Sequence, residues 1–188
     1  VGISVDFVGH STVAVRTPHF GILTDPLLRS TVTFLRRTTP PPTPAQLARP
    51  DVVLLSHLHH DHTDLPSLRM LGASRLIVVP PGSGDFFADR GFDNVRVAVV
   101  GEVLRLAAGV TVLPVPAVHD GARTPRGPRA TAVGYLIELA GRRIYFAGDT
   151  DLYPEMAEFA PVDVALLPVW GWGPNLGPGH MDPNRAAD

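Results

Sequence analysis

The sequence contains neither cysteine nor lysine. Without cysteine, disulfides, thiol nucleophiles and thiolate metal sites are excluded. All 16 basic residues are arginine, which excludes a Schiff-base lysine and the lysine of a phosphate-binding P-loop. Any metal in this chain must therefore be held by His, Asp or Glu side chains.

Long apolar runs and a strong net charge are absent too. No run approaches the roughly 18 apolar residues of a membrane span, no signal peptide is visible, and membrane contact is not indicated. The net charge of −2 gives no reason to expect a nucleic acid as partner. Hydrophobic residues make up 45% of the 188 residues, enough for a core. We expect a single cytoplasmic domain over residues 1–188 that lacks a short N-terminal piece.

Most apolar runs are short and rich in valine, which predicts strands. These runs cover residues 3–10, 11–17, 20–26, 51–56, 75–80, 94–100, 110–118, 131–140, 142–149 and 163–170. Helices are predicted at about 64–71, 83–90 and 153–159, and from about Asp182. The proline-rich segment 36–50 predicts a surface loop. Strand runs with interspersed helices indicate an α/β sandwich with the sheets inside and the helices outside.

The stretch SHLHHDH follows the apolar run DVVLL and holds four of the eight histidines. In an extended segment alternate side chains share a face, so we expect His57 and His59 to point the same way. Asp61 and His62 can turn toward the same space, whereas His60 is expected to be exposed. Two neutral imidazoles, together with a third imidazole, suit a zinc ion. A carboxylate and an imidazole could supply the first ligands of a second metal site.

Two later strands end in further candidate ligands. The run VTVLPVPAVH ends at His119, and RRIYFAGD ends at Asp149 after a glycine that gives the backbone room to turn. A carboxylate has two oxygens and can bridge two metals about 3.5–4 Å apart. Each residue alone could be a surface histidine or a turn aspartate. Together with the SHLHHDH stretch they indicate a metal centre at the strand ends.

These motifs resemble the metallo-β-lactamase superfamily over nearly the whole chain. The matching residues are TDP at 24–26, SHLHHDH at 56–62, His119, FAGDT at 146–150 and GHMDP at 179–183. The resemblance implies an αββα sandwich of two mixed sheets flanked by helices. The motifs HHDHTD and LLPVWGWGPNLGPGHMDP resemble in particular the hydrolases similar to N-acyl-phosphatidylethanolamine phospholipase D and ascorbate-phosphate lactonase.

The resemblance also implies the ligands of two zinc ions. One ion would be held by His57, His59 and His119, and the other by Asp61 and His62, with Asp149 between them. Manganese or iron could take the place of zinc. The resemblance favours a role for Asp25 as a carboxylate that orients the histidine loop, over the alternative of a simple Asp-Pro turn.

One part of the family pattern is missing. The second metal usually takes a last histidine after a further helix and strand, roughly 11 and five residues long, but only five residues follow Pro183. We therefore expect a chain that is truncated at its C-terminus and that binds one metal tightly and a second weakly or not at all. His180 could replace the absent ligand, but the resemblance favours a role facing the substrate.

Several other residues have two open interpretations. His10 could line the pocket near the metals or be a strand-end histidine with ordinary hydrogen bonds. Arg123, Arg126 and Arg129 could meet an anionic substrate or lie in a solvated loop. Trp170 and Trp172 could form a pocket wall or pack in the core.

The expected activity is hydrolysis of an ester, lactone or phosphodiester bond in a small-molecule substrate, possibly an anionic one. A metal-bound hydroxide would attack, oriented by Asp61, and His180 would contact the substrate or leaving group. A di-iron oxidoreductase could use the same scaffold, but it commonly has Glu where His59 stands. A non-catalytic metal-binding protein is the third possibility.

Overall fold

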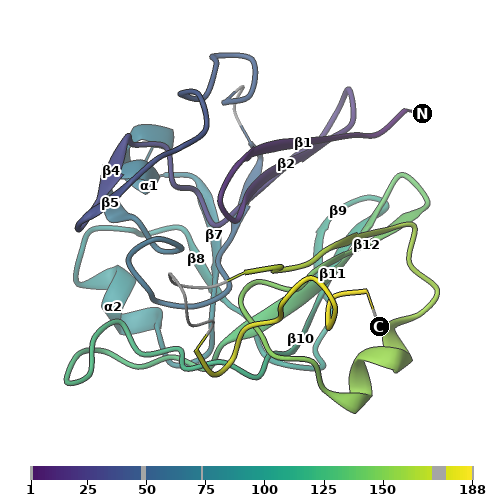
Figure 1. The fold of residues 1–188 in the computed structure, drawn as a ribbon. Helices are drawn as coiled ribbons and strands as arrows, with labels where there is room; N and C mark the ends of the chain where they lie inside the picture. The colour runs from purple at the N-terminus through teal and green to yellow at the C-terminus, as the bar shows by residue number, and fades with distance from the viewer. Residues whose placement is uncertain (1, 48–49, 73, 171–176, 188) are drawn as a thin grey trace.

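Two sheets pack face to face in this chain, for which a computed structural model describes residues 2–47, 50–72, 74–170 and 177–187 (Figure 1). The N-terminal sheet has the strand order β1 (Ser4–Gly9), β2 (Thr12–Arg16), β3 (Gly21–Thr24), β6 (Val52–Leu54), β7 (Leu76–Val79) and β8 (Val95–Val97). The C-terminal sheet has the order β13 (Val164–Leu166), β12 (Arg142–Phe146), β11 (Val133–Leu139), β10 (Val110–Pro116) and β9 (Leu104–Ala107). Both sheets mix parallel and antiparallel pairs.

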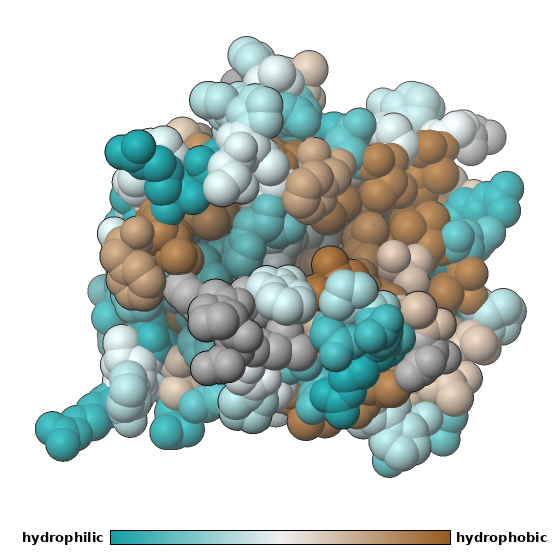
Figure 2. All heavy atoms as spheres, viewed as in Figure 1, coloured by the Kyte–Doolittle hydropathy of each residue, from teal (hydrophilic) through white to brown (hydrophobic). Residues whose placement is uncertain are grey.

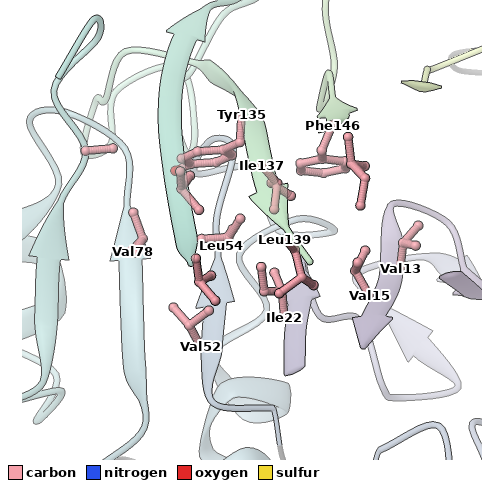
Figure 3. Packing of buried hydrophobic residues seen from close by; sticks show 14 of the residues in the cluster. Val13, Val15, Ile22, Val52, Leu54, Val78, Tyr135, Ile137, Leu139 and Phe146 are labelled. Carbon is pink, nitrogen blue, oxygen red and sulfur yellow. The ribbon is translucent and has the colours of Figure 1, made fainter. Parts of the chain in front are cut away.

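Alternation along β6 divides the apolar side chains between two layers. Val52 and Leu54 face the C-terminal sheet, where they pack with residues such as Tyr135 and Phe146 (Figure 3). Val53 belongs to a separate cluster on the opposite face of the same sheet. Because strand side chains alternate in direction, a strand that is apolar at every position must be covered on both faces.

Helices cover the two outer faces. The helices α1 (Leu65–Leu71) and α2 (Gly84–Ala88) pack Leu68, Phe86 and Phe87 on the outer side of the N-terminal sheet. A 3-10 helix, η1 (Pro154–Phe159), places Phe159 against Tyr145 on the outer side of the C-terminal sheet, with ring centroids 5.2 Å apart. The four layers confirm the predicted αββα sandwich.

The structure corrects several predicted elements. Residues 153–159 form a 3-10 helix rather than an α-helix, and residues 183–187 form turns where a helix was expected. The hairpin of β4 (Thr31–Val32) and β5 (Leu35–Arg36) was not predicted, because two-residue strands are too short to show a period. The strand β9 was missed because it alternates half-buried and exposed residues at the edge of its sheet.

The topology brings the ends of several strands to one edge of the sandwich. The strands β3 and β6 are parallel, so their last residues lie side by side. The strands β10 and β12 both run antiparallel to β11, so their ends meet the start of β11. The two sheets join there, because the Val133 amide at the start of β11 donates to the Ser56 carbonyl beyond β6, 3.0 Å away.

On the face shown in Figure 2, hydrophilic side chains gather in a hollow near the centre. None of the helices in the described residues has the length and apolarity that crossing a bilayer requires.

Candidate metal centre

The histidine loop, residues 56–64, connects β6 to α1 and is held at both ends. At its start, the Ser56 amide donates to Asp25 Oδ1 at 2.8 Å. Further along, the Thr63 hydroxyl donates to the carbonyl of His57 at 2.7 Å. At its end, the Asp64 side chain caps α1 by accepting from the Ser67 amide. These bonds fix the loop backbone against the edge of the sheet.

Three histidines of the predicted first site converge. His57 Nε2 lies 3.0 Å from His59 Nδ1, and His119 Nε2 lies 3.2 Å from the same atom. The outer nitrogens of two of these rings are bonded elsewhere: His57 Nδ1 lies 2.9 Å from Ser56 Oγ, and His119 Nδ1 lies 2.9 Å from the Gly179 carbonyl. Such bonds fix ring orientation and leave the inner nitrogens facing one another.

The predicted second site forms beside the first around Asp149 Oδ2. This oxygen lies 3.1 Å from His62 Nε2, 4.0 Å from His57 Nε2 and 3.4 Å from His180 Nε2. Asp61 Oδ2 lies 3.7 Å from His62 Nε2. The carboxylate of Asp149 therefore stands between the two groups of imidazoles, as a bridging ligand would.

Burial and charge set the protonation of these groups. Burial lowers the pKa of His57, His59 and His119, the last to about 4. For His62, burial would lower the pKa, but the charges of Asp149 and Asp61 outweigh it and raise the pKa above its ordinary value. Burial raises the pKa of Asp149, but His62 and His180 hold it below its usual range. The first three imidazoles are thus neutral at pH 7, which is the form that binds metal.

The donor atoms fit divalent metal ions. Ligand atoms about 2.1 Å from a shared tetrahedral ion lie about 3.4 Å apart, and the His57–His59 and His59–His119 nitrogens are 3.0 and 3.2 Å apart. His62 Nε2 is buried and has no hydrogen-bond partner of acceptable geometry, although Asp149 is only 3.1 Å away. A buried donor or acceptor without a partner is costly, and a metal ion would satisfy this nitrogen.

Asp25 lies directly behind His62. Its Oδ2 is 2.8 Å from His62 Nδ1, and the carboxylate also accepts from the Ser56 amide and hydroxyl. Asp25 is fully buried and has a φ of 31°, in the left-handed region that non-glycine residues rarely adopt. A strained, buried carboxylate on the far nitrogen of an imidazole is the arrangement by which proteins orient metal ligands.

His180 comes from the C-terminal segment and covers the other side of Asp149. Its ring centroid lies 4.8 Å from that of His119, and its Nδ1 lies 3.1 Å from the Pro178 carbonyl. The hydrogen bond to Asp149 raises the pKa of His180. His180 therefore stands at the site, within reach of both the metal ligands and the adjoining cavity.

A cavity of about 390 Å³ opens beside Asp61, Asp149 and His180. The β4–β5 hairpin also lines it and contributes Thr31, Val32, Leu35 and Arg36. Trp170 also lines the cavity, in agreement with its interpretation as part of a pocket wall. Trp172 lies outside the described residues. The cavity has the size of a small-molecule site.

Arg123 does not face this cavity. Its Nη1 donates to the carbonyls of Leu58 and Thr63, each at 3.0 Å, and its Nη2 lies 3.1 Å from His60 Nδ1. His60 is consequently half-buried rather than exposed. The sequence offered no sign of this role, because the arginine and the loop are far apart in the chain. Arg126 and Arg129 are exposed.

The comparisons with known proteins agree with this fold. The beta-lactamase superfamily domain matches residues 21–188. An uncharacterised protein of Mycobacterium tuberculosis is 28% identical over 197 residues, covering 98% of this chain and 53% of that protein. The chain thus spans about half the length of that relative. A UPF0173 metal-dependent hydrolase of Pyrococcus abyssi is 26% identical over 174 residues, covering 90% of this chain and 73% of the hydrolase.

Two solved structures are similar as well. Igni18, a metallo hydrolase from Ignicoccus hospitalis, has a TM-score of 0.73 and 26% identity, covering 98% of this chain and 75% of its own. CmlA, a diiron beta-hydroxylase from Streptomyces venezuelae, has a TM-score of 0.66 and 26% identity, covering 87% of this chain and 34% of its own. The resemblance noted in the sequence is confirmed, and the chain belongs to the beta-lactamase superfamily domain family.

Proposed function

We propose that this protein is a metal-dependent hydrolase with a dinuclear centre, most suited to zinc. The observation that carries the proposal is the convergence of three neutral imidazoles beside the unsatisfied Nε2 of His62, with Asp149 between them. Imidazole and carboxylate ligands without thiolate suit zinc, and they also accept manganese or iron. The similarity to Igni18 and to the Pyrococcus abyssi hydrolase supports the reaction class.

In this proposal His57, His59 and His119 would hold one metal and Asp61 and His62 would hold the second, with Asp149 available to both. Metals bound there would supply Lewis acidity and an activated water at neutral pH. The residues around the metals would then position the activated water. Burial raises the pKa of Asp61, but His62 and His10 outweigh burial and keep it a carboxylate, so Asp61 could accept a hydrogen bond from the water and orient it.

His180 is positioned to assist the leaving group. Its Nε2 lies 3.4 Å from Asp149 and its side chain lines the cavity. The hydrogen bond to Asp149 raises the pKa of His180, and a protonated imidazole at this position could donate to an alcohol or phosphate oxygen. The cavity volume favours a small ester, lactone or phosphodiester. Arg36, which also lines the cavity, would favour a substrate that carries a negative charge.

The test is metal analysis paired with a substrate panel. The purified chain should contain a transition metal, and it should hydrolyse at least one member of a panel of p-nitrophenyl esters, lactones and bis-p-nitrophenyl phosphate. Removing the metal with a chelator should abolish turnover, and adding zinc should restore it. A chain without transition metal after mild purification would overturn the proposal.

A di-iron oxidoreductase is the second candidate, because CmlA has the same fold at 26% identity. His59 supplies imidazole where such enzymes commonly have Glu, which favours the hydrolase. Iron as the resident metal, with oxygen consumption and no hydrolysis across the panel, would favour the oxidoreductase instead.

A further inference from the structure

His10 occupies an unusual backbone position at the turn between β1 and β2. Its φ is 56°, and Gly9 before it has a φ of 133°. The pairing of β1 with β2 is irregular between Phe7 and Gly9. A non-glycine residue in the left-handed region is strained, and irregularities of this kind often redirect a side chain next to a functional site.

The imidazole of His10 is directed into the second metal site. Its Nε2 lies 3.0 Å from Asp61 Oδ2, and its ring centroid lies 4.8 Å from that of His62. His10, Asp61 and His62 each offer a ligand atom within 4.8 Å of the other two. His180, by contrast, groups with His119 and Asp149.

The separations match those of metal ligands. Atoms bound to one tetrahedral ion at about 2.1 Å lie about 3.4 Å apart. The observed values are 3.0 Å for His10–Asp61, 3.7 Å for Asp61–His62 and 3.1 Å for His62–Asp149. The ligand atoms of His10, Asp61 and His62 are therefore close enough together for one ion, and Asp149 adjoins them through His62, whose buried Nε2 has no hydrogen-bond partner of acceptable geometry.

We propose that His10 is a ligand of the second metal, together with Asp61, His62 and the shared carboxylate of Asp149. The assignment rests on the proposed dinuclear centre, and it gives the second site the imidazole that the sequence motifs did not supply. His180 then remains free to act on the substrate. The side chain of His10 is 41% exposed toward solvent and lines the cavity, so a metal held by it would lie at the cavity wall, within reach of a substrate.

The test is a cobalt titration of the metal-depleted chain, followed by visible absorbance and calorimetry. The unaltered chain should bind two equivalents of Co²⁺. His10→Asn should leave the first equivalent unchanged and weaken the second by at least about tenfold, since even indirect partners of metal ligands contribute 10–100-fold. Asparagine tolerates the left-handed backbone, so this variant should fold normally. His19→Asn, at an exposed histidine of the next turn, is the matched control.

Three results would overturn the assignment. The first is His10→Asn binding two equivalents with unaltered affinity. The second is His180→Asn losing the second equivalent while His10→Asn keeps it. The third is a single equivalent, or none, in the unaltered chain. Absence of hydrolysis with an intact two-equivalent titration would instead count against the proposed activity and leave His10 as a ligand.

Discussion

Asp149 is the residue on which both proposed metal sites depend. Its Oδ2 lies within 4.0 Å of His57, His62 and His180. Asp149→Ala should therefore lower metal content and abolish turnover together, as measured by elemental analysis and by rate on the best substrate. Asp93→Ala is the control, because Asp93 is an exposed carboxylate on the loop before β8. Full metal content and full rate in Asp149→Ala would show that FAGDT is only a turn.

The protonation of His119 can be measured in the metal-free chain. Burial, more than any other cause, lowers its pKa to about 4, so the ring should stay neutral from pH 7 until the pH falls near 4. An unfolded histidine titrates near 6.5, so protonation opposes folding of the metal-free chain as the pH falls from about 6.5 toward 4. The ring-proton chemical shift followed by NMR would show this, and a midpoint near 6.5 would contradict it.

At the residue scale, the candidate ligands came from the histidine motif, from two strand ends and from the family resemblance. His57, His59, Asp61 and His62 lie in one short motif, and His119 and Asp149 end strands. His10 and Arg123 could be given no definite role, because their contacts join segments far apart in sequence. His10 reaches Asp61 only through the turn geometry of β1 and β2, which no local pattern reveals.

The histidine loop carries several of the proposed metal ligands, and Arg123 supports its backbone through hydrogen bonds. The guanidinium bonds two loop carbonyls and lies over the Phe86 ring, 5.2 Å from its centroid. Arg123→Gln removes these bonds and should weaken metal binding about tenfold, the size seen when supporting groups of a metal site are lost. The measurement is metal affinity by competition with a chromophoric chelator.

Arg126→Gln, at an exposed arginine in the segment between β10 and β11 that also carries Arg123, is the control for that change. Rescue by Arg123→Lys should be partial, because an ammonium cannot match the planar fork that spans two carbonyls. Unaltered affinity in Arg123→Gln would mean that the histidine loop keeps its position without Arg123, through β6, α1 and Asp25.

Elements with a strong hydrophobic period could be predicted from the sequence, whereas very short elements could not. The helix α1 has a capping aspartate, a proline in its first turn and an apolar face, all visible in the sequence. The β4–β5 hairpin has only two residues in each strand, so its position is set by its surroundings rather than by its own pattern. This hairpin forms a wall of the cavity, and substrate specificity is therefore the property that the sequence describes least.

At the scale of the whole molecule, stability depends on the core between the two sheets. Leu54 is fully buried there, among residues of both sheets (Figure 3). Leu54→Ala should lower the free energy of unfolding by about 2–5 kcal/mol, measured by urea denaturation of the metal-free chain. Val103→Ala, at a side chain that is 55% exposed, should change it by less than about 0.5 kcal/mol. Equal effects would show that the sheets do not pack as described.

The histidine loop belongs to the N-terminal sheet, whereas His119 and Asp149 follow strands of the C-terminal sheet. Neither half of the chain can assemble the ligand set alone. The order of events during folding follows from this: the sheets must dock before the ligands meet, and contacts between such distant segments form slowly. Before the sheets dock, the proposed ligands are not yet together, so a metal ion would bind weakly. Tight metal binding would therefore coincide with the last stage of folding, when the complete site has formed.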